Sequence, residues 1–149
     1  MGLGKTVQLI VLLQWERKKN PDQNFPPTLL VVPTSVIGNW HRELGRFSPE
    51  LKVHIHHGPS RPVGSEFDRL VQDSDVVITT YALVSRDQQT LQEQVWHRVV
   101  LDEAQYIKNP PTKQTAAIRS LQTDRRIALT GTPVENRLTE LWSIMEFCN

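Results

Sequence analysis

Short apolar runs alternate with longer segments of helical periodicity along the chain. A short apolar run bounded by polar or turn-forming residues is typical of a buried strand, whereas apolar residues three or four apart predict a helix. The runs predict strands at residues 28–32, 52–57, 75–81, 98–101 and 126–129. The helical spacing predicts helices at residues 7–15, 36–47, 66–72, 82–95, 112–121 and 138–147. This alternation indicates an α/β fold with a mostly parallel sheet flanked by helices.

Two of the predicted helices carry an apolar stripe that we expect to be buried. The first stripe consists of Val36, Trp40, Leu44 and Phe47, and the last helix carries Leu138, Leu141, Trp142, Met145 and Phe147. The chain has 149 residues, of which 38% are hydrophobic, so it has the size and apolar content of one ordinary domain.

Two adjacent acids follow the predicted strand that ends at Leu101. Asp102 and Glu103 would lie at the carboxyl edge of a parallel sheet, which is where such sheets bind ligands. Mg²⁺ prefers one or two carboxylates together with phosphate oxygens and water. The pair therefore indicates a Mg²⁺-nucleotide site, and the alternative is a strand that ends in an acidic turn.

The N-terminal residues resemble the end of a phosphate-binding loop. Gly2, Gly4, Lys5 and Thr6 fit the last part of the G-x-x-x-x-G-K-S/T pattern, and a predicted helix follows. In such a loop the lysine reaches the β- and γ-phosphates, and the Thr hydroxyl holds Mg²⁺. The strand that normally precedes the loop is missing here, so the alternative is a flexible glycine-rich terminus.

Hydroxyl-bearing residues follow two other predicted strands. Pro33, Thr34 and Ser35 come after the strand at 28–32, while Thr79 and Thr80 end the strand at 75–81. Loop hydroxyls often contact backbone phosphates of nucleic acid, which gives these residues a candidate DNA-binding role. The alternative for Thr34 or Ser35 is a helix N-cap.

Composition narrows the remaining choices. Lys and Arg total 17 against 16 for Asp and Glu, so nucleic-acid contacts would depend on local placement of donors. A single cysteine allows no internal disulfide, and no apolar run reaches transmembrane length. His54, His56 and His57 do not predict a metal site, because strand alternation splits them between two faces.

Four motifs in order resemble one family. They are Met-Gly-Leu-Gly-Lys-Thr at 1–6, Val-Val-Pro-Thr-Ser at 31–35, Asp-Glu-Ala-Gln-Tyr-Ile-Lys-Asn at 102–109, and Leu-Thr-Gly-Thr-Pro-Val-Glu-Asn-Arg-Leu-Thr-Glu-Leu-Trp-Ser at 129–143. Together they resemble the Swi/Snf family of DNA-dependent ATPases in helicase superfamily two, and the Gln105 variant resembles bacterial members most. The resemblance spans nearly the whole chain.

The resemblance implies that residues 1–149 form the first RecA-like motor lobe, a P-loop NTPase fold. By it, Gly2, Gly4, Lys5 and Thr6 bind ATP, and Thr6 and Asp102 hold Mg²⁺. It makes Glu103 the residue that positions and polarises the attacking water. Phosphoryl transfer depends mostly on such positioning and on electrostatic stabilisation.

The resemblance also implies coupling and DNA-binding roles. Gln105 would link the ATP site to Thr130, Gly131 and Thr132, which match the motif that couples hydrolysis to lobe movement. The DNA-backbone contacts of the family would come from Pro33, Thr34, Ser35, Thr79 and Thr80, and Tyr81 lies in the same region.

The chain departs from the family pattern at both ends. The adenine-contacting segment and the strand before the P-loop are missing, as is the second RecA-like lobe with its arginine fingers. We therefore expect an incomplete first lobe that lacks its first strand and has no turnover alone. The strand at 126–129 should lack one neighbour.

The function that we expect for the intact protein is ATP-driven translocation on double-stranded DNA, with remodelling of a DNA-bound protein target. Its partners would be DNA and the second lobe, with no membrane, in a bacterial cytoplasm at the nucleoid or in a eukaryotic nucleus. One alternative is a strand-separating helicase or restriction-system motor. Another is a nucleic-acid-binding fragment without catalysis.

Overall fold

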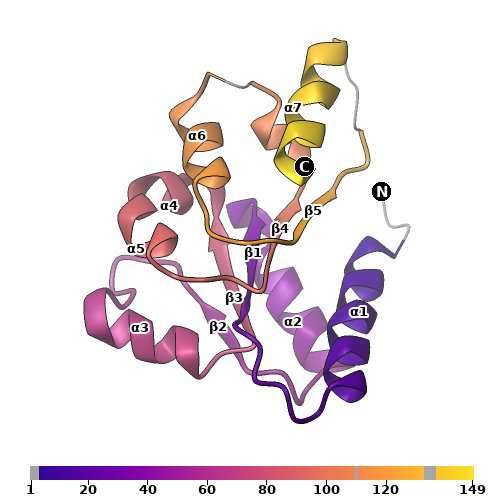
Figure 1. The fold of residues 1–149 in the computed structure, drawn as a ribbon, viewed down its shortest axis with the longest axis vertical. Helices are drawn as coiled ribbons and strands as arrows, with labels where there is room; N and C mark the ends of the chain where they lie inside the picture. The colour runs from indigo at the N-terminus through magenta and orange to yellow at the C-terminus, as the bar shows by residue number, and fades with distance from the viewer. Residues whose placement is uncertain (1–3, 110, 133–136) are drawn as a thin grey trace.

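A five-stranded parallel sheet forms the centre of the molecule in the computed structural model, which describes residues 4–109, 111–132 and 137–149. The strand order is β2-β3-β1-β4-β5 (Figure 1). The strands are β1 (Thr28–Val32), β2 (Val53–Ile55), β3 (Val76–Thr80), β4 (Arg98–Asp102) and β5 (Arg126–Leu129). The predicted α/β class and parallel sheet are confirmed.

Helices cover both faces of this sheet (Figure 1). One face packs against α1 (Lys5–Lys19) and α2 (Ile37–Phe47), and α2 follows a 3₁₀ turn, η1 (Thr34–Val36). The other face packs against α3 (Gly64–Gln72), α4 (Tyr81–Arg86), α5 (Gln88–Gln92), α6 (Lys113–Arg119) and α7 (Leu138–Cys148). A second 3₁₀ turn, η2 (Ala104–Ile107), follows β4.

The central strand β1 is buried on both faces, which explains why its sequence is apolar at every position but the first. Leu29 and Val31 belong to one core cluster, whereas Leu30 and Val32 belong to the cluster on the opposite face. All four side chains are essentially inaccessible to solvent. A strand buried on both faces gains from apolar side chains at successive positions, so it lacks the alternation of a half-exposed strand.

The strand at the β5 edge has the bounds that the sequence predicts. Within the described residues it pairs only with β4, and all four of its side chains are half-buried. The expected open side of this strand is therefore present in the structure. Edge strands with unpaired backbone groups are templates for pairing with other chains.

The prediction of one helix over 82–95 is wrong. The helix is interrupted at Asp87, which follows the last residue of α4 and precedes the first residue of α5. Helix α5 ends at Gln92. The Asp87 carboxylate accepts hydrogen bonds from the Arg61 guanidinium at 2.6 and 2.8 Å and lies 2.8 Å from His56 Nε2. These distant partners fix Asp87 at the break, and the local helical pattern does not reveal them.

The predicted buried stripe of the last helix is also largely wrong. Leu138, Trp142 and Met145 are exposed, and Phe147 is the member of that stripe which is fully buried. Ser143 is buried as well, because its hydroxyl donates a hydrogen bond to the carbonyl oxygen of Ile107. This pairing removes the cost of burying a hydroxyl and lets the helix turn a polar residue inward.

The prediction that the apolar stripe on α2 is buried is confirmed at the centre of the stripe and wrong at its C-terminal end. Trp40 and Leu44 are buried, Val36 is half-buried and Phe47 is exposed. The proposed N-cap role of Thr34 or Ser35 is wrong, because α2 begins after Val36 and neither η1 nor α2 has a side-chain cap. Among the described helices, none is long and apolar enough to cross a membrane.

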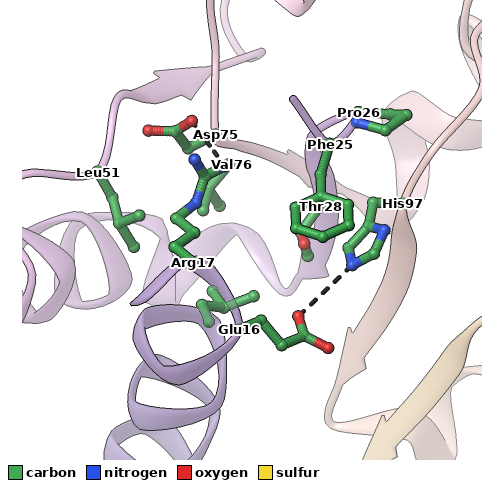
Figure 2. Close-up of a pocket in the computed structure, with 10 residues that line it drawn as sticks. Glu16, Arg17, Phe25, Pro26, Thr28, Leu51, Asp75, Val76 and His97 are labelled. Carbon is green, nitrogen blue, oxygen red and sulfur yellow. Dashed lines mark ion pairs between the residues drawn. The ribbon is translucent and has the colours of Figure 1, made fainter. Parts of the chain in front are cut away.

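Helix α1 is tied to the amino edge of the sheet by Glu16. The Glu16 carboxylate accepts hydrogen bonds from Arg98 at 2.5 and 3.0 Å and from Arg125 at 3.1 Å, and it lies 3.5 Å from His97 Nε2. Figure 2 shows Glu16 facing His97, and Arg17 pairing with Asp75. These ion pairs hold the helix that carries Lys5 and Thr6 in place on the sheet.

Candidate functional site

The carboxyl edge of the sheet collects most of the residues to which the sequence assigns chemistry. Because the strands are parallel, the segments that follow β1, β3, β4 and β5 all emerge at this edge. They begin with Pro33, Tyr81, Glu103 and Thr130, respectively. The crevice outside the carboxyl ends of parallel strands is the usual ligand site in open α/β sheets.

Asp102 ends β4 and is only 9% exposed. Its Oδ2 accepts a hydrogen bond from Trp40 Nε1 at 2.8 Å, and its Oδ1 accepts one from the Glu103 N–H at 3.0 Å. Burial and the nearby Glu103 charge raise the pKa of Asp102, although the Trp40 bond and the Lys5 charge act in the opposite direction. A buried carboxylate with a raised pKa would be stabilised by a bound cation.

Trp40 contributes to the candidate site by bonding to Asp102, and this role was not predicted from the sequence. Its place in the apolar stripe of α2 indicates only core packing. The ring is 2% exposed, and a buried indole N–H normally finds a partner. That general requirement was the one available signal, but it could not identify Asp102, which lies 62 residues away. Trp40 therefore fixes the Oδ2 atom of Asp102 from helix α2, which packs on one face of the sheet.

Glu103 has an uncommon backbone conformation. Its φ is 51° and its ψ is 56°, and no other non-glycine residue in the described ranges has a positive φ. Non-glycine residues rarely adopt this left-handed region, and strained residues cluster at functional sites. The turn directs the chain out of β4 into η2 and leaves the Glu103 side chain half-buried at the sheet edge.

Gln105 connects the acidic pair to the segment after β5. Its Nε2 donates to Glu103 Oε2 at 2.6 Å, and its Oε1 accepts from Thr130 Oγ1 at 3.0 Å. Thr130 Oγ1 in turn accepts from the Thr132 N–H at 3.1 Å, and Gly131 lies between them. The structure thus brings together the residues predicted to couple hydrolysis to movement.

The N-terminus of α1 supplies the candidate phosphate-binding part of the site. Gly4 has a φ of 73°, a left-handed turn that suits glycine, and Lys5 and Thr6 begin the helix. The helix has no side-chain cap, so no side chain of the cap residue occupies its first N–H groups, and helix N-termini of this kind suit an anion. Gly2 lies outside the described residues.

These groups fit a Mg²⁺-nucleotide. The amides and the Lys5 ammonium supply positive charge for phosphates, and Thr6 and Asp102 supply oxygen atoms for a hard cation. The proximity of Lys5 is visible in its effect on the pKa of Asp102. The donor set therefore matches the cofactors ATP and Mg²⁺ that the sequence predicts.

A hollow of about 350 Å³ lies beside the acidic pair at the same edge. Its lining comes from the ends of β1 and β3 and from η1, α4, η2 and α6, and comprises Val32, Pro33, Thr34, Ser35, Thr80, Tyr81, Ala82, Tyr106 and Gln114. Thr34 and Ser35 are exposed in it. Tyr106 and Gln114 were not selected from sequence, because their approach depends on how η2 and α6 pack.

Thr79 and Thr80 are less available than the other two hydroxyls. Thr79 is fully buried, and its Oγ1 donates to the His56 carbonyl oxygen at 3.2 Å. Thr80 is 3% exposed and caps α4, since its Oγ1 accepts from the Leu83 N–H at 3.3 Å. A contact between the Thr79 side chain and DNA would require this side chain to leave its buried position.

The three histidines lie in different environments. His56 is buried against Asp87 and Phe67, and burial lowers its pKa despite the Asp87 charge. His54 is half-buried, and His57 is exposed. Within the ranges that the structure describes, no group of three or more His, Cys, Asp or Glu side chains is arranged to hold a metal ion by itself.

Comparison with known proteins identifies the family. The family described as the SNF2-related domain matches residues 1–149. This chain belongs to the SNF2-related domain family. The predicted resemblance to Swi/Snf ATPases is therefore confirmed.

Relatives of this SNF2-related domain occur in bacteria and fungi. YwqA of Bacillus subtilis strain 168, whose name describes an ATP-dependent helicase or translocase, is 50% identical over 149 residues. Helicase swr1 of Emericella nidulans is 41% identical over 149 residues. The alignments cover 100% and 99% of this chain but only 16% and 9% of those proteins. Both relatives thus have names that describe helicases, and the chain spans a small part of their length.

The fold of the SNF2-related domain matches solved structures of the same kind. The SWI2/SNF2 ATPase core of Sulfolobus solfataricus in complex with double-stranded DNA superposes with a TM-score of 0.85 at 43% identity. The match covers 100% of this chain and 30% of that chain. The RecA-like architecture predicted from sequence is therefore confirmed.

Proposed function

We propose that this SNF2-related domain is the first motor lobe of an ATP-driven double-stranded-DNA translocase. The observation that carries the proposal is the hydrogen-bonded series Glu103–Gln105–Thr130, which lies beside buried Asp102 and next to the Thr34–Ser35 hollow. In this proposal the series would join the hydrolytic site to the surface that contacts a nucleic-acid backbone, both at the same edge of the sheet. The DNA complex of the Sulfolobus core supports the assignment.

ATP would bind with its phosphates on the N-terminal amides of α1. Lys5 would contact the β- and γ-phosphates, and the left-handed turn at Gly4 would let the backbone face them, a role that the sequence also assigns to Gly2. Thr6 and Asp102 would hold Mg²⁺, whose charge offsets that of the phosphate oxygens. Trp40 would keep the Asp102 carboxylate in one orientation through its 2.8 Å bond.

Glu103 would position the water that attacks the γ-phosphorus. The water oxygen would bond to the γ-phosphorus while the bond from this phosphorus to the β–γ bridging oxygen breaks, the water proton would pass to the Glu103 carboxylate, and ADP and phosphate would leave. Gln105 holds the Glu103 carboxylate at 2.6 Å, and this bond restricts where the water is directed. Most of the catalysis in such reactions comes from positioning and electrostatic stabilisation.

DNA would lie across the hollow at the carboxyl edge. Thr34 and Ser35 would contact phosphates, with Pro33 and the backbone near Thr80 shaping the surface. Phosphate contacts position a protein without reading sequence, so binding should tolerate any sequence and weaken as salt rises. Movement of Thr130, Gly131 and Thr132 would carry the state of the ATP site to a second lobe.

The proposed working unit comprises residues 1–149 as the first lobe and a second RecA-like lobe in the intact protein. Turnover would require that second lobe, since arginines supplied across the cleft act on transition-state charge. The proposed partners are double-stranded DNA and a DNA-bound protein that is remodelled, in the cytoplasm or nucleus. A strand-separating helicase is the second candidate, because relatives carry helicase names.

The test compares two lysines of α1 in the intact protein. Lys5→Ala should weaken ATP binding at least tenfold, because it removes a phosphate contact, whereas Lys18→Ala at the far end of the helix should change it less than twofold. ATP hydrolysis with and without duplex DNA is measured on the same samples. Wild-type protein without DNA-stimulated hydrolysis would contradict the proposal, and unwinding of a labelled duplex would favour the helicase candidate.

A further inference from the structure

Two tyrosine rings connect the hollow to the acidic pair. Tyr81, the first residue of α4, is 3% exposed, whereas Tyr106 on η2 is 51% exposed. Their rings stack with centroids 4.8 Å apart and planes 15° apart. Both residues line the hollow. A ligand in the hollow would therefore meet the exposed ring of a pair whose other ring is buried.

The buried ring reaches the backbone of the acidic pair. Tyr81 Oη donates a 2.6 Å hydrogen bond to the carbonyl oxygen of Asp102 and lies 3.4 Å from the carbonyl oxygen of Glu103. These two carbonyls belong to the peptide groups on either side of Glu103. They flank the residue whose left-handed backbone sets the direction of its carboxylate.

The exposed ring is attached to the same turn. The Tyr106 N–H donates to the Glu103 carbonyl oxygen at 3.1 Å, so η2 begins from a bond to the strained residue. A shift of Tyr106 would move this carbonyl and press on the Tyr81 ring. The Tyr81 hydroxyl is the donor in both contacts, because a carbonyl oxygen can only accept a hydrogen bond.

We propose that Tyr81 is a positioning residue that fixes the backbone of Glu103 and, through its stack with Tyr106, couples a DNA backbone in the hollow to the water-positioning carboxylate. The inference rests on the proposed function and deepens it by assigning the route from the DNA-facing surface to the ATP site. The route is distinct from the Gln105–Thr130 bonds, which leave the acidic pair toward β5.

The test removes one hydroxyl at a time in the intact protein. Tyr81→Phe keeps the ring and loses the bond to Asp102, whereas Ser65→Ala removes an exposed hydroxyl of α3 that lies outside the lining of the hollow and serves as the control. At saturating duplex DNA, Tyr81→Phe should lower kcat about fivefold to tenfold, the size expected for one hydrogen bond. Its KM for ATP and its Kd for DNA should stay within twofold of wild type, and Ser65→Ala should stay within twofold of wild type in kcat, KM and Kd.

A second variant tests the stack itself. Tyr106→Ala removes an exposed ring and leaves the Tyr81 hydroxyl in place, so the maximal stimulation by DNA should fall at least threefold. Thermal unfolding is measured on every variant. If Tyr81→Phe does not fold, Tyr106→Ala decides the proposal, and unchanged maximal stimulation in that variant overturns it.

Other outcomes separate this inference from the proposed function. A folded Tyr81→Phe protein with wild-type kcat overturns the inference. So does one whose only defect is weaker DNA binding, because Tyr81 would then be a simple DNA contact. Absence of DNA-stimulated hydrolysis in the wild type would instead refute the proposed function.

Discussion

The two edges of the central sheet use charged residues in opposite ways. At the amino edge, Glu16 pairs with Arg98 and Arg125, while Arg17 pairs with Asp75 at 2.6 Å. The cavity between them encloses only about 10 Å³, no more room than one water needs (Figure 2). At the carboxyl edge the acids lie beside a hollow of about 350 Å³.

The pKa values follow the same division. Burial alone would raise the pKa of Glu16, but the Arg98 guanidinium and His97 outweigh it, so the pKa of Glu16 is lowered. Burial raises the pKa of Asp102, and the Trp40 and Lys5 contributions do not offset it. One edge satisfies its charges within the fold, and the other keeps a carboxylate whose charge is offset only in part. This difference favours the carboxyl edge, rather than the amino edge, as the candidate site for a cationic ligand.

The largest expected effect separates activity from stability at the carboxyl edge. Asp102→Asn should lower kcat for ATP by about 10²-fold or more, because it removes a charged ligand from the proposed Mg²⁺ site. The free energy of unfolding should change by less than about 1 kcal/mol, since relief of a buried charge offsets the loss of one accepted hydrogen bond. Steady-state kinetics and hydrogen exchange of the β4 amides check both parts.

The amino edge should show the reverse behaviour. Arg98→Ala removes the 4%-exposed partner of Glu16 and should lower the free energy of unfolding by about 3 kcal/mol, the lower end for breaking a buried pair. Arg125→Ala, which removes a largely exposed partner, should cost less than about 1 kcal/mol. Hydrogen exchange of the β4 amides measures the loss of stability in both variants. A large loss of kcat per folded molecule in Arg98→Ala would contradict the separation of a stabilising amino edge from a catalytic carboxyl edge.

A smaller effect concerns acid. Because the folded-state pKa of Glu16 lies below its ordinary value of 4.5, its ion pairs stabilise the fold above that pH. This contribution is lost as the pH falls from 4.5 through the lowered pKa, because the unfolded chain then binds the proton more tightly. In Glu16→Gln, the protection of the β4 amides against hydrogen exchange should therefore fall less steeply below pH 4.5 than it does in the wild type. An unchanged acid profile would remove Glu16 from the stabilising cluster.

Local signals explain what the sequence could predict. The bounds of β1 and β5 follow from short apolar runs, and Asp102 and Glu103 follow directly from the end of such a run. The existence of α1 follows from the apolar residues after Gly4-Lys5-Thr6, but the helix begins at Lys5, two residues before the predicted start at residue 7. These features need only a few consecutive residues.

Distant contacts explain what the sequence could not predict. The break at Asp87 depends on Arg61 and His56, which lie 26 and 31 residues away. The inward turn of Ser143 depends on the carbonyl of Ile107, 36 residues away. The same holds for Trp40 and Asp102, so the residues that hold the acidic pair emerge only when the layers pack.

The measurement that tests the account most directly compares two glutamates at opposite edges of the sheet. In the intact protein with saturating duplex DNA, Glu103→Gln should bind ATP normally while its kcat falls by about 10² to 10⁴, the range for loss of a residue acting on a proton in the transition state. Glu16→Gln should keep wild-type kcat per folded molecule. A Glu103→Gln enzyme with near-normal turnover would contradict the assignment of the carboxyl edge as the ATPase site.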